Sequence, residues 1–210
     1  MQYYFTLFFI TFSAAFLGTM PPGMLNLTAL KIRVSKGKKN AYLFTLGVSI
    51  IILIQALIGV QISKYLYHHP EVIDLLMKIA IAIFLLLSLY FFASAKKVTD
   101  ERQKIASSKK RNDFLKGLIL ASLNMLAIPY YSGINAMWLS SGWIVFNPID
   151  TAVFILGASI GSAAVLLFYV RYFKNFKIEK NRFSKRLNYM LSALMIILVI
   201  ITLIRLYYRS

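Results

Sequence analysis

Long apolar stretches alternate with short basic ones along this 210-residue chain. A helix needs about 20 mostly apolar residues to cross the hydrocarbon core of a membrane. The run from Gly117 to Val170 is too long for one such helix, and Gly142, Asn147 and Pro148 divide it. The pattern therefore predicts six membrane-spanning helices, at residues 2–30, 41–63, 75–95, about 114–139, about 150–170 and 187–207.

The basic residues predict how these helices are oriented. Five lie in the loop 31–40, eight in 96–116 and seven in 171–186. Of the two remaining loops, the second holds only Lys64 and the fourth holds no basic residue. Short loops rich in Lys and Arg stay on the cytoplasmic side. We therefore expect a multi-pass protein of the cytoplasmic (inner) membrane, with both termini outside and the basic loops against anionic lipid.

Composition excludes several classes of function. Apolar residues make up 59% of the chain and charged residues only 15%, which is typical of a protein embedded in a lipid bilayer. Nearly all of the net charge of +17 lies in the three basic loops, so nucleic acid is not an expected partner. There is no cysteine, and the two histidines share one loop, so we predict no catalytic residue, no metal site and no cofactor. The first apolar stretch lacks the basic start of a signal peptide and is predicted to be a retained span.

The two halves of the chain resemble each other. "FTLGVSI" at 44–50 matches "FILGASI" at 154–160, and the same offset places Gly23 on Gly133. Three spans per half is an odd number, so repeated halves must lie in opposite orientations. The predicted fold is an all-α, polytopic membrane protein whose six transmembrane helices form two inverted three-helix repeats. It is one transporter domain, with repeat one at 1–95, a cytoplasmic loop at 96–113 and repeat two at 114–210.

Helix-breaking residues interrupt the first span of each half. Pro21, Pro22 and Gly23 lie roughly 15 Å from the cytoplasmic end of the first span, and Pro129 lies roughly 20 Å into the fourth, at the helical rise per residue. Non-helical backbone at membrane depth is tolerated only where it is buried in protein or lines a wet cavity. Broken helices at matching positions are typical of secondary transporters. A kink that only serves packing is the alternative.

Polar residues near these breaks are the candidate substrate contacts. Each has a structural alternative, which is hydrogen bonding between helices for the amides and interfacial anchoring for the tyrosines. Tyr131 is assigned to the anchoring alternative, and Gly47, Gly157 and Gly161 to close helix packing, with Ser159 and Ser162 beside them. The predicted substrate-binding residues are Pro21, Pro22, Gly23, Asn26, Gln55, Asn124, Pro129, Tyr130, Ser132 and Asn135.

Acidic residues are missing from the middle of every predicted span. Asp74, Asp113 and Asp150 lie at span ends, so no carboxylate is placed to pair with a cationic substrate or to relay protons. We therefore expect a neutral or zwitterionic substrate. The positive N-terminal end of a half-helix would bind its carboxylate, and freed backbone carbonyls would bind its ammonium group.

Several motifs resemble those of the LysE/RhtB family of amino-acid exporters. They are "LGTMPPGMLNLTAL" at 17–30, "KGKKNAYLFTLGVS" at 36–49 and "FLKGLILASLNMLAIP" at 114–129. Two prolines of the family pattern are replaced here, by Met24 in the Pro-Gly-Pro element and by Met125 in the Asn-Pro pair. The resemblance implies export of amino acids or similar small metabolites, driven by the proton-motive force.

The predicted function is that of a secondary transporter, not an enzyme. Electron transfer through paired cysteines is excluded because the chain has none, and the spans hold no set of residues for intramembrane hydrolysis. The alternative is a non-transporting membrane scaffold or assembly protein of the same fold. Expected partners are the lipid bilayer and a small amino-acid-like substrate. The sequence does not decide whether protons take part in transport or whether the chain forms a homo-oligomer.

Overall fold

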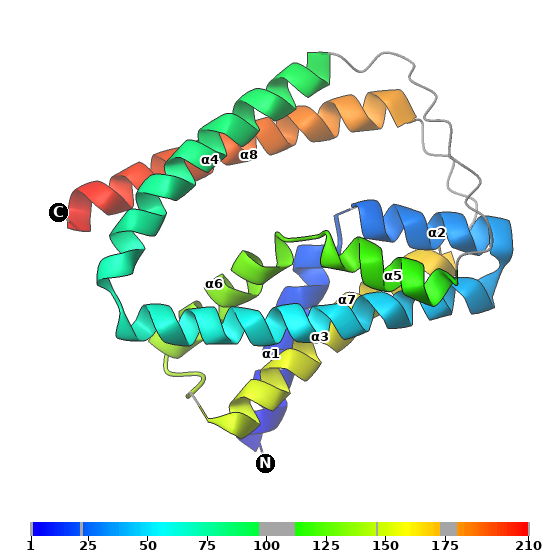
Figure 1. The fold of residues 1–210 in the computed structure, drawn as a ribbon, viewed down its shortest axis with the longest axis horizontal. Coiled ribbons are helices and arrows are strands. Elements are labelled where there is room, and N and C mark those ends of the chain that lie inside the picture. The colour runs from blue at the N-terminus through cyan, green and yellow to red at the C-terminus, as the bar shows by residue number, and fades with distance from the viewer. Residues whose placement is uncertain (1, 22, 97–111, 146, 173–179, 210) are drawn as a thin grey trace. The chain divides into compact units, whose positions relative to one another are not determined.

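The computed structural model describes residues 2–21, 23–96, 112–145, 147–172 and 180–209. These residues form helices and no strand, so the fold is all-α. Eight helices lie within the described ranges (Figure 1). They are α1 (Gln2–Thr19), α2 (Met24–Lys36), α3 (Lys38–His68), α4 (Glu71–Lys96), α5 (Asp113–Ser122), α6 (Ala127–Ser140), α7 (Pro148–Tyr172) and α8 (Lys180–Arg209).

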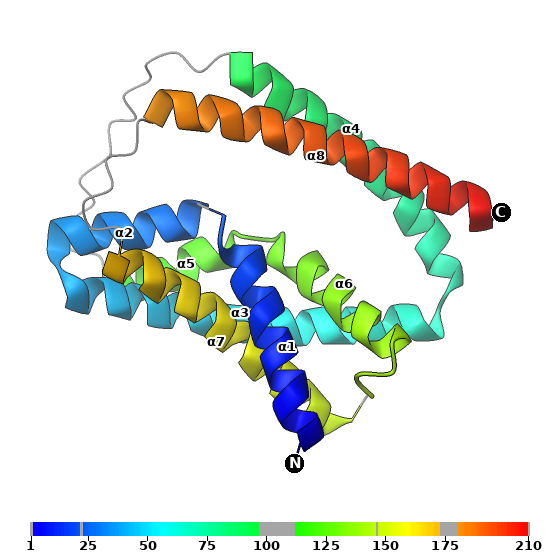
Figure 2. The same ribbon diagram turned by 180° about the vertical axis from the view of Figure 1, so that it is seen from behind.

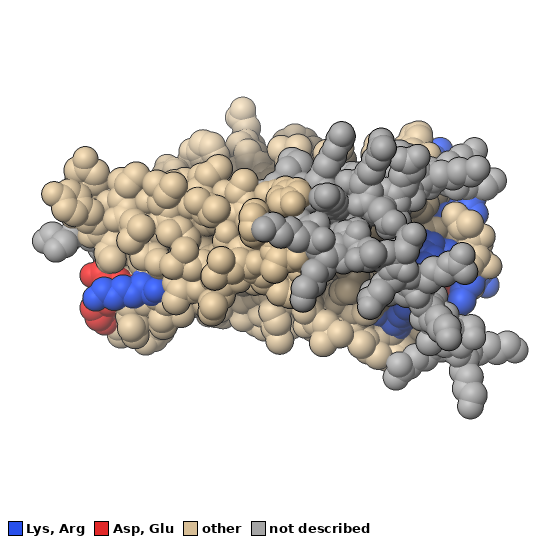
Figure 3. Space-filling view, turned by 90° about the horizontal axis from the view of Figure 1, so that it is seen from above, with Lys and Arg blue, Asp and Glu red and all other residues tan. Residues whose placement is uncertain are grey.

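Three helices are each long and apolar enough to cross a membrane, namely α3, α4 and α7. Two bent pairs qualify when each is taken as one span, α1 with α2 and α5 with α6. Within the described part of α8, the apolar stretch 192–208 is shorter than such a span. The structure thus supports three to five spans, and the sixth remains a prediction. In Figure 3, the described charged side chains gather near the two ends of the view, and uncharged residues cover the described surface between them.

Helix boundaries agree with the sequence pattern where local chemistry sets them. The division predicted at Gly142, Asn147 and Pro148 is confirmed, because α6 ends at Ser140 and α7 begins at Pro148. Gly142 has φ +71°, a left-handed conformation that suits glycine. The Asn147 side chain accepts a hydrogen bond from the Asp150 N–H at 2.7 Å and so caps α7.

The first basic loop is shorter than predicted. The range 31–40 is helical except for Gly37, which has φ +91° and separates α2 from α3. Lysine and arginine are good helix formers, so a basic segment need not be a loop. One glycine in a left-handed conformation is enough to reverse the chain there.

The chain divides into two compact units, and each contains helices from both halves of the sequence. The first unit holds α1, α2, α3, α5, α6 and α7, and the second holds α4 and α8. In the first unit the core is built around buried side chains such as Phe44, Tyr131 and Phe154. Close helix contacts in this unit run between the halves, with α1 against α7 and α5 against α3.

Glycines permit these contacts. A Cβ atom on Gly157 would lie 3.0 Å from the Phe8 carbonyl oxygen of α1, and one on Gly161 would overlap the Phe12 carbonyl oxygen. A Cβ atom on Gly47 would overlap the Phe114 carbonyl oxygen of α5. At these points backbone touches backbone, which small residues allow in membrane helices.

Two pairs of serines join the halves at single points. In the first unit, the Ser159 hydroxyl donates to the Ser49 carbonyl at 2.9 Å. In the second unit, α4 and α8 run side by side in opposite directions (Figures 1 and 2). There Ser88 donates to the Ser192 carbonyl at 3.3 Å, and Ser192 donates to the Ser88 carbonyl at 3.1 Å. Each contact joins a helix from the first half of the sequence to a helix from the second half.

Candidate functional site

The first break separates α1 from α2, whose axes differ by 78°. Asn26, in the first turn of α2, points back into the break, and its side-chain NH₂ group donates to the carbonyls of Thr19 at 2.8 Å and Pro21 at 3.0 Å. The Tyr169 hydroxyl of α7 donates to the Met20 carbonyl at 2.9 Å. Carbonyls left over at the end of α1 are therefore bound by side chains. Pro22 lies outside the described residues.

The second break separates α5 from α6 at an angle of 65°. Gln55 of α3 reaches it from outside, and its NH₂ group donates to the carbonyls of Ala121 at 3.0 Å and Asn124 at 3.1 Å. Gln55 is 5% exposed, and its Oε1 atom is buried without a hydrogen-bond partner. One buried amide thus binds two carbonyls at each break. In lipid, where backbone groups without partners cost several kcal/mol, such an amide stabilises the broken conformation.

The sequence predicted the second break at Pro129, but the break lies a few residues earlier in the chain. α5 ends at Ser122 and α6 begins at Ala127, so Pro129 is the third residue of α6 and its side chain is exposed. Proline is tolerated in the first turn of a helix because the N–H groups there have no partner within the helix. Asn124 is the predicted residue that lies inside the break, and it is half-buried.

The helices that begin after the two breaks, α6 and α2, differ in the contacts of their first turns. At α6, the Ala127 N–H donates to the Asn124 carbonyl and the Ile128 N–H to the Met125 carbonyl, both at 3.3 Å. At α2, Gly23 is the N-cap and no side chain caps the helix. Beside Gly23, the position of a missing Cβ meets only the Pro21 carbonyl oxygen, at 3.9 Å. The start of α2 therefore has no side-chain cap among the described residues, and it carries the positive end of a helix dipole.

The remaining predicted residues lie on α6. The Tyr130 hydroxyl donates to the Ala14 carbonyl of α1 at 2.7 Å, and its ring packs over Gly18. Ser132 is buried where α6 meets Gly59 of α3. Asn135 is 0% exposed, and neither atom of its amide group has a hydrogen-bond partner.

Tyr131 is not the interfacial anchor that we predicted. It is 1% exposed, and its hydroxyl forms a 2.8 Å hydrogen bond with the Ser162 hydroxyl of α7. The neighbouring serine Ser159 binds the Ser49 carbonyl. An apolar helix does not reveal from its sequence which face is buried, so Tyr130 and Tyr131 could not be separated by pattern alone.

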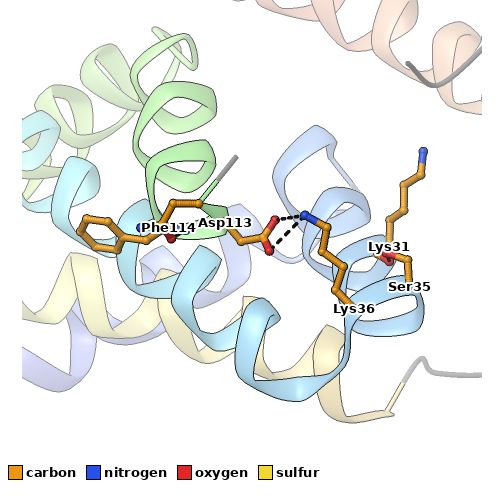
Figure 4. A network of polar contacts seen from close by, with 6 residues as sticks. Lys31, Ser35, Lys36, Asp113 and Phe114 are labelled. Carbon is orange, nitrogen blue, oxygen red and sulfur yellow. Dashed lines mark hydrogen bonds and ion pairs between the residues drawn. The ribbon is translucent and has the colours of Figure 1, made fainter. Parts of the chain in front are cut away.

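An ion pair that the sequence did not suggest joins the ends of α2 and α5. Figure 4 shows the Lys36 ammonium group reaching both carboxylate oxygens of Asp113, at 2.9 and 3.2 Å. Asp113 is 6% exposed and Lys36 is 39% exposed. Asn112 caps α5 by accepting the Phe114 N–H at 3.3 Å, which fixes the first turn that carries Asp113.

A double-mutant cycle tests this pair. Lys36→Met leaves the buried Asp113 carboxylate without its cation and is expected to lower the free energy of unfolding by about 1.5–3 kcal/mol. Asp113→Asn is expected to remove the same interaction, so the double variant should lose less than the sum of the singles. Thermal unfolding of the purified protein measures each value. Lys39→Met, on the exposed first turn of α3, is the matched control, and additive losses would contradict the pair.

A second buried carboxylate lies at the start of α7. Asp150 is fully buried, and its Oδ2 atom accepts from the Tyr3 hydroxyl at 2.6 Å and from the Val145 N–H at 2.8 Å. Its position at a helix end agrees with the sequence, but its burial and its tie to α1 were not predicted. Asp113 and Asp150 thus each connect two helices at an end of the bundle.

Comparison with known proteins addresses the chain as a whole. A model of the LysE type translocator family matches residues 16–205. Searches of curated proteins and of solved structures found no match. The matched range includes both breaks, the Asn26 and Gln55 amides that bind them, and the ion pair. Members of this family are membrane transporters and not enzymes. The chain therefore belongs to the LysE type translocator family.

Proposed function

We propose that this protein exports amino acids or related small metabolites across the cytoplasmic membrane. The observation that carries the proposal is the pair of breaks inside apolar, membrane-length segments, each stabilised by a buried amide from Asn26 or Gln55. A helix interrupted at membrane depth is tolerated only where the freed backbone is buried in protein or lines a wet cavity. Discontinuous helices of this kind form the substrate sites of many secondary transporters.

The substrate we propose is neutral or zwitterionic. In the described part of the chain, Asp113 and Asp150 lie at helix ends and are bound by other residues, so neither is placed to pair with a cationic side chain at the breaks. A carboxylate fits the uncapped start of α2 beside Gly23, where N–H groups and the helix dipole favour an anion. The candidate substrate contacts remain the residues predicted around the breaks. Among them, Asn26 and Gln55 also hold the backbone of the breaks in place.

Repeat symmetry is part of the same proposal. Ser49 and Ser159 occupy equivalent places in the matched sequences, and they touch each other. A residue that contacts its own counterpart lies on the axis that relates two copies. In the second unit, Ser88 and Ser192 each donate to the carbonyl of the other. The contact between Ser49 and Ser159 supports an inverted repeat, and six spans with both termini outside complete the proposal.

Efflux measurements test the function. Cells are preloaded with a mixture of amino acids, and the loss of each compound is followed for wild type and Asn124→Ala at equal membrane abundance. We expect wild type to accelerate the loss of one or a few compounds and Asn124→Ala to slow that loss at least tenfold. Ser122→Ala, exposed and next to the break, is the control. If no compound leaves faster with wild type, with or without a proton gradient, the non-transporting scaffold replaces the transporter.

A further inference from the structure

Where α3 meets α6, three polar atoms of two buried side chains have no hydrogen-bond partner within the described part of the chain. They are the Ser63 hydroxyl oxygen and both amide atoms of Asn135. Ser63 is 1% exposed and Asn135 is 0% exposed. A buried polar group without a partner costs about 1–3 kcal/mol, and neighbouring helices in native proteins normally supply one. An amide with both its donor and its acceptor unpaired therefore points to a ligand that the protein itself does not provide.

The contacts between α3 and α6 place these two residues at the same level. Gln55 of α3 contacts residues of the second break, and Gly59, one turn later, lies against Ile128 and Ser132 of α6. The residue numbers on both helices rise together, so the helices run in the same direction. One further turn reaches Ser63 on α3 and Asn135 on α6. The two helices approach closely at Gly59, whose Cβ position would lie 2.9 Å from the Ser132 nitrogen.

A cavity lies beside the part of α3 that carries Ser63. A cavity of about 330 Å³ is lined by Val60, Gln61 and Lys64 of α3 and by Asn147, Pro148 and Thr151 at the start of α7. The α3 residues flank Ser63 on both sides in sequence. The cavity is roomy enough for several water molecules, and its polar side chains suit them.

We propose that Ser63 and Asn135 form a hydrated polar site that binds an uncharged hydrogen-bonding group of the transported solute. The site lies beyond the second break, past the contact at Gly59, and the nearby cavity at Gln61 and Lys64 is the route by which water would reach it. Its ligand class follows from its atoms, since a hydroxyl and an amide offer donors and acceptors but no charge. The hydration rests on the unpaired atoms and the cavity, whereas the solute contact rests also on the proposed transport function.

The absence of cysteine makes hydration directly measurable. Ser63→Cys and Ala56→Cys each introduce the only thiol of the chain, both at buried positions of α3 that lie on one face. The full-length variants in lipid nanodiscs are treated with a charged methanethiosulfonate. We expect Ser63→Cys to react at least tenfold faster than Ala56→Cys, because the thiolate must meet water and reagent. Equal rates would overturn the hydrated site.

Asn135→Leu supplies a second test that does not depend on labelling. Leucine is close in size to asparagine and removes the unpaired atoms, so the variant is expected to melt at the same temperature as wild type or above it. Asn26→Leu, which loses two hydrogen bonds, is expected to melt several degrees lower. A similar drop for Asn135→Leu would show that its amide is paired and would overturn the proposal.

Transport separates the two parts of the proposal. Asn135→Leu is expected to slow efflux of the compounds exported by wild type at least tenfold while remaining folded. Normal efflux by this variant would exclude the solute contact. If wild type exports nothing but Ser63→Cys still reacts, the transport function and the solute contact fail together and the hydrated site stands.

Discussion

Replacing Gly117 with alanine is expected to cost about 1–3 kcal/mol of stability, the usual range for overpacking a well-packed core. A Cβ atom there would overlap the Phe44 carbonyl oxygen of α3. Gly47 stands in the reciprocal position, because its Cβ atom would overlap the Phe114 carbonyl oxygen of α5. Backbone atoms cannot move aside as a flexible side chain can, so the two helices would have to separate. We therefore expect Gly117→Ala and Gly47→Ala to lower the melting temperature by several degrees or more.

A glycine of the same unit supplies the control. Gly133 lies within α6, and nothing stands within 4 Å of the position of its Cβ atom. Gly133→Ala is expected to keep or raise the melting temperature, because alanine favours helix by about 1 kcal/mol over glycine. Thermal unfolding and size-exclusion profiles of the three purified variants give the comparison. Gly117→Ala with wild-type stability would show that α3 and α5 do not meet at this contact.

Replacing Gln55 with leucine is the substitution expected to damage the second break most. Its NH₂ group donates to the carbonyls of Ala121 and Asn124, and each hydrogen bond lost is expected to cost about 0.5–1.5 kcal/mol, because both carbonyls keep a backbone N–H donor. Gln55→Leu should therefore lower the melting temperature and also slow efflux at least tenfold, since the break loses its fixed geometry. Gln55→Glu should act in the same direction, because a carboxylate has the same shape but cannot donate to the carbonyls.

An exposed amide provides the reference for this change. Gln2→Leu makes the same replacement at an exposed position of α1 and is expected to leave both melting temperature and efflux near wild type. Differential scanning fluorimetry and the efflux assay at matched membrane abundance measure the two effects. If Gln55→Leu transports as well as Gln2→Leu, the hydrogen bonds from Gln55 to the second break have no part in transport.

Local chemistry accounts for what the sequence predicted well. The apolar stretches predicted at 41–63, 75–95 and 150–170 lie within α3, α4 and α7. The interruption predicted at Pro21 and Gly23 separates α1 from α2 as expected. Length, apolar composition and the dihedral limits of proline and glycine act within a few residues, so the sequence shows them directly.

The second break shows where local reasoning ends. Proline at 129 is compatible with the first turn of a helix, and the residues 123–126 that actually leave the helix carry no proline or glycine. Among them, the Asn124 carbonyl is bound by Gln55, which lies 69 residues earlier in the chain. The cost of breaking a helix there is met by a distant side chain, and no pattern near the break records it.

The sequence by itself determined the helical class, the membrane-length segments and the first break of this protein. Tertiary structure decided which polar side chains meet. Lys36 pairs with Asp113, Tyr169 binds the Met20 carbonyl, and Asn135 is enclosed without a partner. In soluble helices an apolar stripe marks the buried face, but lipid is apolar too, so both faces of a spanning helix look alike in sequence. Only packing of the helices against one another shows which side of each faces the interior.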